Sequence, residues 1–251
     1  SHNELEDLVL WIGFLGQDRR GISLNCITTR TPSKLGWSNS CPFGLGGFIL
    51  SGRAWRIQLP PLSPIFGVDI ANNVLELLAM LVTIWLTILE CNAHDSIQEC
   101  ILAMGDNTSA IGWLHKSGRL KPGSAYYAPV QFIARQIARL LLRSSHCLAS
   151  QHIKGDKNVV SDLLSFAEAS GADHLLALDN PSDASRTQRF HNHIPQLIPA
   201  GFVISPLPNK ISSFVIQALQ MTESSLSQNK KNPMRNATEP GAITYPSALS
   251  Q

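Results

Sequence analysis

The stretch that decides the fold is residues 35–59, LGWSNSCPFGLGGFILSGRAWRIQL. Within it, Leu35–Ser40, Gly46–Leu50 and Ala54–Leu59 are short runs of strand length separated by turn-forming residues. Ser51-Gly52, between the last two runs, has the chemistry of a hairpin turn. The stretch therefore predicts a meander of three consecutive strands.

Beyond the meander, the pattern predicts an alternation of helices and strands. The expected helices are Val74–Glu90, Thr108–Lys116, Tyr126–Arg143 and Val159–Ala169, and the expected strands are Ile101–Gly105 and Cys147–Ile153. A meander followed by such an alternation predicts an α/β fold, with one mixed five-stranded sheet flanked by helices. An irregular C-terminal tail is expected after it.

The flanking segments differ from this central part. Residues 1–33 carry one amphipathic helix, Leu5–Leu15, and are expected to be a connecting segment, whereas residues 34–170 form the predicted domain. Residues 171–251 hold eight of the fifteen prolines and are rich in serine. They are expected to be a spacer with one possible helix at 210–226 and with disorder from about residue 227.

Composition limits the class of protein without naming a function. A net charge of +2 is compatible with a nucleic-acid partner but does not argue for one alone. The five cysteines contain no CxxC pair, which favours reduced thiols in an intracellular protein of the cytoplasm or nucleus. The longest apolar run, Leu77–Leu89, is shorter than the roughly 20 residues that span a bilayer. It predicts a buried helix, and no membrane partner is expected.

Three carboxylates and one amide occupy positions where a metal site could form. Asp106 follows an expected strand, Asn39 lies near the end of the first strand, and Glu76 and Asp162 lie at the starts of helices. Because sites in α/β sheets form outside the carboxyl ends of strands, these residues could converge at one edge. Oxygen ligands of this kind suit Mg²⁺ or Mn²⁺, and two such ions can hydrolyse a phosphodiester.

Each carboxylate also has a purely structural interpretation. Asn73 and Glu76 have the spacing of a helix capping box. Asp106 could cap the helix that follows it, and Asp162 could be an exposed carboxylate in a first helical turn. The joint pattern is more specific than any one of these residues.

Four ordered blocks carry a resemblance to a known family. They are residues 38–47 (SNSCPFGLGG), 73–79 (NVLELLA), 105–110 (GDNTSA) and 152–165 (HIKGDKNVVSDLLS). Together they resemble the ribonuclease H domain of eukaryotic retrotransposon reverse transcriptases, over about residues 34–167. Residues 1–33 then look like the segment that joins an upstream polymerase domain, and the tail resembles the spacer beyond the nuclease.

The resemblance implies a two-metal cut of RNA in an RNA–DNA hybrid. It places metal-binding carboxylates at the positions of Asn39, Glu76, Asp106 and Asp162, and the first of them departs from the family, which has Asp there. Asn offers one acceptor oxygen and an NH₂ group that no cation can use, so binding of at least one metal ion and cleavage are expected to be impaired. The alternative is a catalytically inactive module of a reverse transcriptase that binds nucleic acid or serves as a structural part. A DNA-cutting relative such as an integrase is a more distant alternative.

Basic residues supply candidate contacts to nucleic acid. Arg135, Arg139 and Arg143 recur every four residues on one expected helix and form a basic stripe, which we call the arginine stripe. Lys116, Arg119 and Lys121 precede that helix in a loop. This arrangement suits phosphates along an RNA–DNA hybrid or another duplex. The alternative is a solvated helix face.

Overall fold

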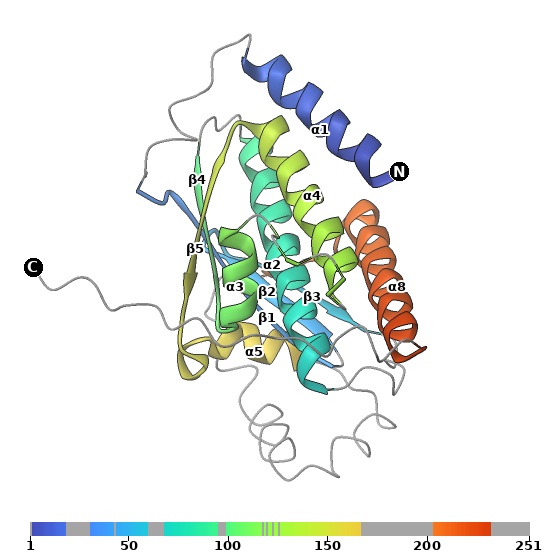
Figure 1. The fold of residues 1–251 in the computed structure, drawn as a ribbon. Coiled ribbons are helices and arrows are strands. Elements are labelled where there is room, and N and C mark those ends of the chain that lie inside the picture. Colours follow the sequence, from blue (N-terminus) through green and yellow to red (C-terminus); the bar gives the residue numbers. More distant parts are fainter. Residues whose placement is uncertain are drawn as a thin grey trace, which may run out of the picture.

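The computed structural model describes residues 2–18, 31–42, 44–59, 68–94, 99–116, 118, 120, 121, 123, 124, 126–166 and 203–231. These residues form one mixed β-sheet with helices packed against it (Figure 1). The predicted α/β class with a mixed sheet is therefore confirmed.

In the described part of the chain, the sheet has six strands in the order β5-β4-β1-β2-β3-β6. The strands are β1 (Lys34–Cys41), β2 (Gly44–Ile49), β3 (Arg53–Gln58), β4 (Cys100–Gly105), β5 (Cys147–His152) and β6 (Val203–Ile204). The first three form the predicted antiparallel meander, while β4 runs parallel to β1 and β5 runs parallel to β4. The expected count of five strands is wrong, because β6 pairs in parallel with β3 and extends the sheet at that edge.

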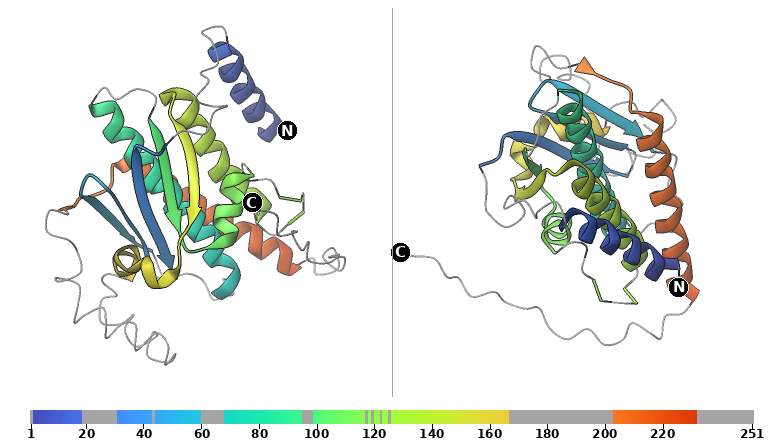
Figure 2. Two further views of the ribbon diagram at one scale, coloured as in Figure 1. Left: turned by 90° about the vertical axis from the view of Figure 1, so that its left-hand side faces the viewer. Right: turned by 90° about the horizontal axis from the view of Figure 1, so that it is seen from above.

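Six helices accompany the sheet within the described residues. They are α1 (His2–Asp18), α2 (Val68–Ala93), α3 (Thr108–His115), α4 (Tyr127–Ser144), α5 (Val159–Phe166) and α8 (Asn209–Lys231), and a short 3-10 turn, η2 (Gly155–Lys157), precedes α5. The four helices expected in the central domain are all present. Figures 1 and 2 show α2, α4 and α8 gathered on one side of the sheet.

Glycines let a helix approach the sheet closely on each face. A Cβ atom on Gly47 would collide with the Thr83 side chain of α2, whereas one on Gly46 would collide with the backbone of Leu164 and Ser165 in α5. Neighbouring residues of a strand point to opposite faces, so α2 and α5 cover opposite faces of β2. The glycine run of the meander thus creates the space for both helices.

Helix α2 is the central element of the core. It begins at Val68, six residues before the predicted start, and most of its side chains between Val74 and Ile88 are buried. Its segment Asn72–Ala93 is long and apolar enough to cross a membrane, but 89% of its apolar 18-residue stretch is buried inside the fold, which is the placement of a core helix. Because Asn73 lies inside α2, it is not the N-cap, and the capping-box interpretation of Asn73 and Glu76 is wrong.

The C-terminal helix α8 packs onto the domain. The Phe214 ring stacks on Phe132 of α4, with centroids 4.6 Å apart, and meets Trp85 of α2 edge to face at 5.9 Å. Ile211 and Val215 are buried in the same core. The helix expected at 210–226 therefore exists as part of the domain's core. It continues to Lys231, past residue 227, where disorder was expected; residues 171–202 and 232–251 lie outside the described part.

Candidate functional site

The topology brings the four candidate positions to one end of the sheet. Asn39 lies two residues before the end of β1, and Asp106 directly follows β4, which runs parallel to β1. Glu76 comes from the third turn of α2 and Asp162 from the first turn of α5. The carboxyl ends of β1 and β4 share this edge, so the residues converge where the sequence pattern predicted.

Asn39 and Asp162 are in direct contact. The side-chain Nδ2 of Asn39 donates a hydrogen bond to Oδ1 of Asp162 at 2.8 Å, across 123 residues of sequence. Asn39 is 4% exposed and Asp162 is half-buried, so this bond is partly buried. A charge-assisted bond of this kind stabilises the carboxylate and joins β1 to α5.

Glu76 is buried close to the same carboxylates. Its Oε1 accepts a hydrogen bond from the backbone N–H of Ser40 at 3.0 Å, and its side chain is almost wholly shielded from solvent. Burial, and then the negative charges of Asp106 and Asp162, raise the pKa of Glu76 to about 8. In the protein alone, Glu76 is therefore largely protonated at pH 7.

Asp106 lies where β4 meets the loop after β5. A Cβ atom on Gly155 would come within 3.1 Å of Asp106 Oδ2, so η2 passes close to this carboxylate. The backbone oxygen of Asp106 lies 3.0 Å from Nε2 of His152. Asp106 is not the cap of α3: that position belongs to Asn107, whose side chain accepts a hydrogen bond from the Ala110 N–H.

Five polar side chains that the sequence did not single out for the site hold its parts in place. Ser40 Oγ donates to Asn72 Oδ1 at 3.2 Å, which links β1 to α2. Asn107 Nδ2 donates to Asn73 Oδ1 at 2.7 Å, which links α3 to α2. Asn158, just before α5, donates from Nδ2 to the Ser38 carbonyl oxygen at 3.0 Å. These bonds join positions far apart in the sequence, so no local pattern points to them.

The donor set does not fit the two metal ions that the resemblance implies. Glu76 Oε2 is buried without a hydrogen-bond partner, as the oxygen of a metal ligand would be, and Asn158 Oδ1 and Ser161 Oγ are in the same condition. Against a metal site, Asn39 directs its NH₂ group at Asp162. The family that the chain resembles has a carboxylate in place of Asn39. Within the described residues, no group of three or more His, Cys, Asp or Glu side chains is arranged to hold a metal ion.

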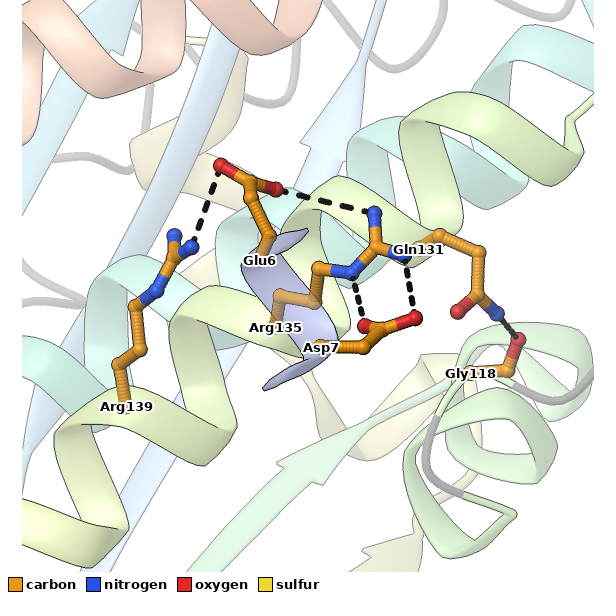
Figure 3. Close-up of polar contacts among 6 residues, drawn as sticks. All are labelled: Glu6, Asp7, Gly118, Gln131, Arg135 and Arg139. Atoms are coloured by element: carbon orange, nitrogen blue, oxygen red, sulfur yellow. Dashed lines mark hydrogen bonds and ion pairs between the residues drawn. The ribbon is translucent and has the colours of Figure 1, made fainter. Parts of the chain in front are cut away.

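The arginine stripe lies on α4 but is largely paired with α1. Arg135 donates from Nε and Nη2 to the two carboxylate oxygens of Asp7, at 2.8 and 3.1 Å, and its Nη1 lies 3.8 Å from Glu6 (Figure 3). Arg139 pairs with Glu6 at 3.2 Å. The hydrogen bond between the Arg135 and Asp7 side chains lowers the pKa of Asp7 and raises that of Arg135.

The other predicted basic contacts are more open. Arg143, Lys116 and Lys121 are exposed, and Arg119 lies outside the described residues. The structure therefore separates the predicted nucleic-acid contacts into exposed ones and two that a neighbouring helix covers.

No protein-family model matches this chain, and no curated protein is significantly similar to it.

Proposed function

We propose that this chain is a ribonuclease H-like domain of a retroelement reverse transcriptase, which binds RNA–DNA hybrid or duplex nucleic acid and whose cleavage centre is impaired. Four sequence blocks in the family's order support the assignment, together with a mixed sheet that carries the candidate residues at one edge. The exposed basic side chains of Lys116, Lys121 and Arg143 in this domain support the nucleic-acid partner.

The hydrogen bond between Asn39 and Asp162 carries the functional argument. In a metal-dependent site, a shared cation neutralises neighbouring carboxylates. Here the Asn39 amide instead donates a direct 2.8 Å hydrogen bond to Oδ1 of Asp162, which stabilises this carboxylate without removing its charge. With Asn39 neutral and Glu76 largely protonated, the four positions carry about two negative charges at pH 7 instead of four. Two negative charges attract divalent cations more weakly than four would.

The second candidate is a hydrolase that retains slow cleavage. The buried Oε2 of Glu76, which has no hydrogen-bond partner, favours it, because a lone pair of this oxygen could coordinate a metal ion. In that case Mg²⁺ or Mn²⁺ would be held by Glu76, Asp106 and Asp162, with Asn39 as a poor fourth ligand. The two candidates share fold and partner and differ only in cleavage.

Cleavage of an RNA–DNA hybrid in Mg²⁺ or Mn²⁺ tests the proposal. We expect little or no cleavage by the unaltered chain, a gain for Asn39→Asp, and loss of that gain in Asn39→Asp/Asp106→Asn, which is the matched control. Robust cleavage that Asn39→Asp leaves unchanged would overturn the proposed impairment. If the unaltered chain and Asn39→Asp both bind the hybrid and neither cleaves it, the chain is a purely non-catalytic module.

A further inference from the structure

Helix α1 covers the part of α4 that carries two arginines of the arginine stripe. Asp7 holds the Arg135 guanidinium with two parallel hydrogen bonds, and Glu6 bridges Arg135 and Arg139 (Figure 3). The Arg135 side chain retains only 12% of its exposure and that of Arg139 retains 26%. Two carboxylates from one helix thus occupy the donor groups that phosphates would use.

This contact is held by charge and not by apolar burial. Among residues 4–13 and 15 of α1, whose side chains the structure describes, none is buried, and only Glu6 and Leu10 are half-buried. Six apolar side chains of the helix are each more than half exposed: Leu5, Leu8, Val9, Trp11, Ile12 and Leu15. Displacing α1 from α4 therefore uncovers no fully buried side chain among these described residues.

We propose that α1 is a displaceable acidic clamp, whose Glu6 and Asp7 compete with the phosphates of a nucleic-acid duplex for Arg135 and Arg139. This inference rests on the nucleic-acid binding in the proposed function and adds its regulation. A carboxylate and a phosphate both match the planar fork of a guanidinium, so the two ligands exclude each other at Arg135. A duplex that also contacts the exposed Arg143 is held at the same helix face and displaces α1.

The exchange is feasible because α1 is held weakly on α4, by ion pairs near solvent. Ion pairs near solvent contribute little to stability and are screened by salt. A duplex presents a phosphate every few ångströms and gains from the release of its own counterions. Once displaced, α1 is a 17-residue helix without a partner, which is only marginally stable in water. Clamp release and unfolding of α1 are therefore coupled.

Binding of a fluorescent RNA–DNA hybrid to the full chain tests the clamp. Asp7→Asn should tighten binding by roughly 2- to 5-fold at low salt, and Glu6→Gln/Asp7→Asn by roughly 3- to 10-fold. Each freed arginine should add about one unit to the slope of log affinity against log salt. Glu90→Gln is the matched control, because it also removes one carboxylate, but from a residue that accepts a hydrogen bond from Ser51. Glu90→Gln should change the affinity and its salt dependence less than Asp7→Asn does.

The tighter hybrid binding of Asp7→Asn should vanish in an Arg135→Gln/Arg139→Gln background, because Glu6 and Asp7 then have no arginine of the pair to bind. Hydrogen exchange gives an independent readout: added hybrid should speed the exchange of amides 2–18 in the unaltered chain. Equal effects of Asp7→Asn and Glu90→Gln, or unchanged exchange in α1 while the hybrid binds, would overturn the clamp. Binding that persists in such a result leaves the proposed partner standing, whereas absence of binding in every variant removes both.

Discussion

Asn39 donates a hydrogen bond to Asp162, and this contact joins the end of β1 to the first turn of α5. The same contact sets the charge of the candidate site, because an amide stands where a carboxylate would need a cation. Structural stability and the proposed cleavage activity therefore depend on the same pair of side chains, and the two properties favour different residues at position 39. An amide stabilises the protein without metal, whereas a carboxylate would make its stability depend on metal.

Asn39→Asp should destabilise the metal-free protein and create a dependence on Mg²⁺. The new carboxylate would face Asp162 at hydrogen-bond distance, so we expect a loss of about 2–4 kcal/mol of unfolding free energy. Millimolar Mg²⁺ should recover much of that loss and should raise the melting temperature of the unaltered chain far less. Thermal denaturation with and without Mg²⁺ measures both.

The exchanged pair Asn39→Asp/Asp162→Asn is the matched control for this change. It restores one amide and one carboxylate in the reverse order, so its metal-free stability should return towards that of the unaltered chain. A double variant as unstable as Asn39→Asp would show that the hydrogen bond is not the cause.

Glu76 should make stability fall as pH rises. Its pKa is raised from 4.5 to about 8 in the folded state, so between these values the folded protein holds a proton that the unfolded chain releases. Its contribution is fully present below about pH 4.5 and is lost as pH approaches 8. Glu76→Gln should flatten this profile and be the more stable form at pH 8 by on the order of a few kcal/mol.

Denaturant unfolding across pH 4.5–8.5 measures whether the free energy of unfolding falls as pH rises. The glutamine of the Glu76→Gln variant keeps an oxygen to accept the Ser40 N–H, so the comparison isolates the titrating proton. Glu90→Gln, near the C-terminal end of the same helix, serves as the control and should keep the slope of the unaltered chain. A Glu76→Gln variant that loses stability at pH 8 would contradict the assignment.

Phe214 should anchor the C-terminal helix to the domain. Its ring stacks on Phe132 and meets Trp85 edge to face, so Phe214→Ala should cost about 2–4 kcal/mol. Ile216→Ala, on the same helix but 55% exposed, should cost less than about 0.5 kcal/mol. If the two variants unfold at the same denaturant concentration, α8 is not part of the cooperative core.

Local patterns predicted the elements better than their contacts. The meander and the helix–strand alternation follow from strand-length runs, turn residues and apolar stretches, which short segments encode by themselves. The start of α2 was misplaced because Asn73 and Glu76 imitate a capping box, although Asn73 instead bonds Asn107. The alternative role of Asp106 as the cap of α3 is wrong by one residue for a similar reason, since Asp106 and Asn107 are both good caps.

Contacts between distant segments could not be predicted in this way. β6 has only two residues and gains its strand structure from pairing with β3. The pairing of Arg135 with Asp7 spans 128 residues, and the arginine spacing alone suggested an open stripe. At the site, the identity of Asn39 was visible in the sequence, but the direction of its hydrogen bond depends on where α5 lies.

Gly46 should control that position of α5. A Cβ atom there would collide with the backbone of Leu164 and Ser165, and backbone cannot move aside as a flexible side chain can. Gly46→Ala should therefore push α5 from the sheet, cost about 1–3 kcal/mol or more, and weaken the bond between Asn39 and Asp162. Urea unfolding and the NMR signal of the Asn39 side-chain amide report the two effects separately. Gly112→Ala is the control: a Cβ there meets nothing within 4 Å, so this change within α3 should stabilise by about 0.5–1 kcal/mol. An Asn39 amide signal that stays unchanged in Gly46→Ala would show that the site does not depend on the packing of α5 against β2.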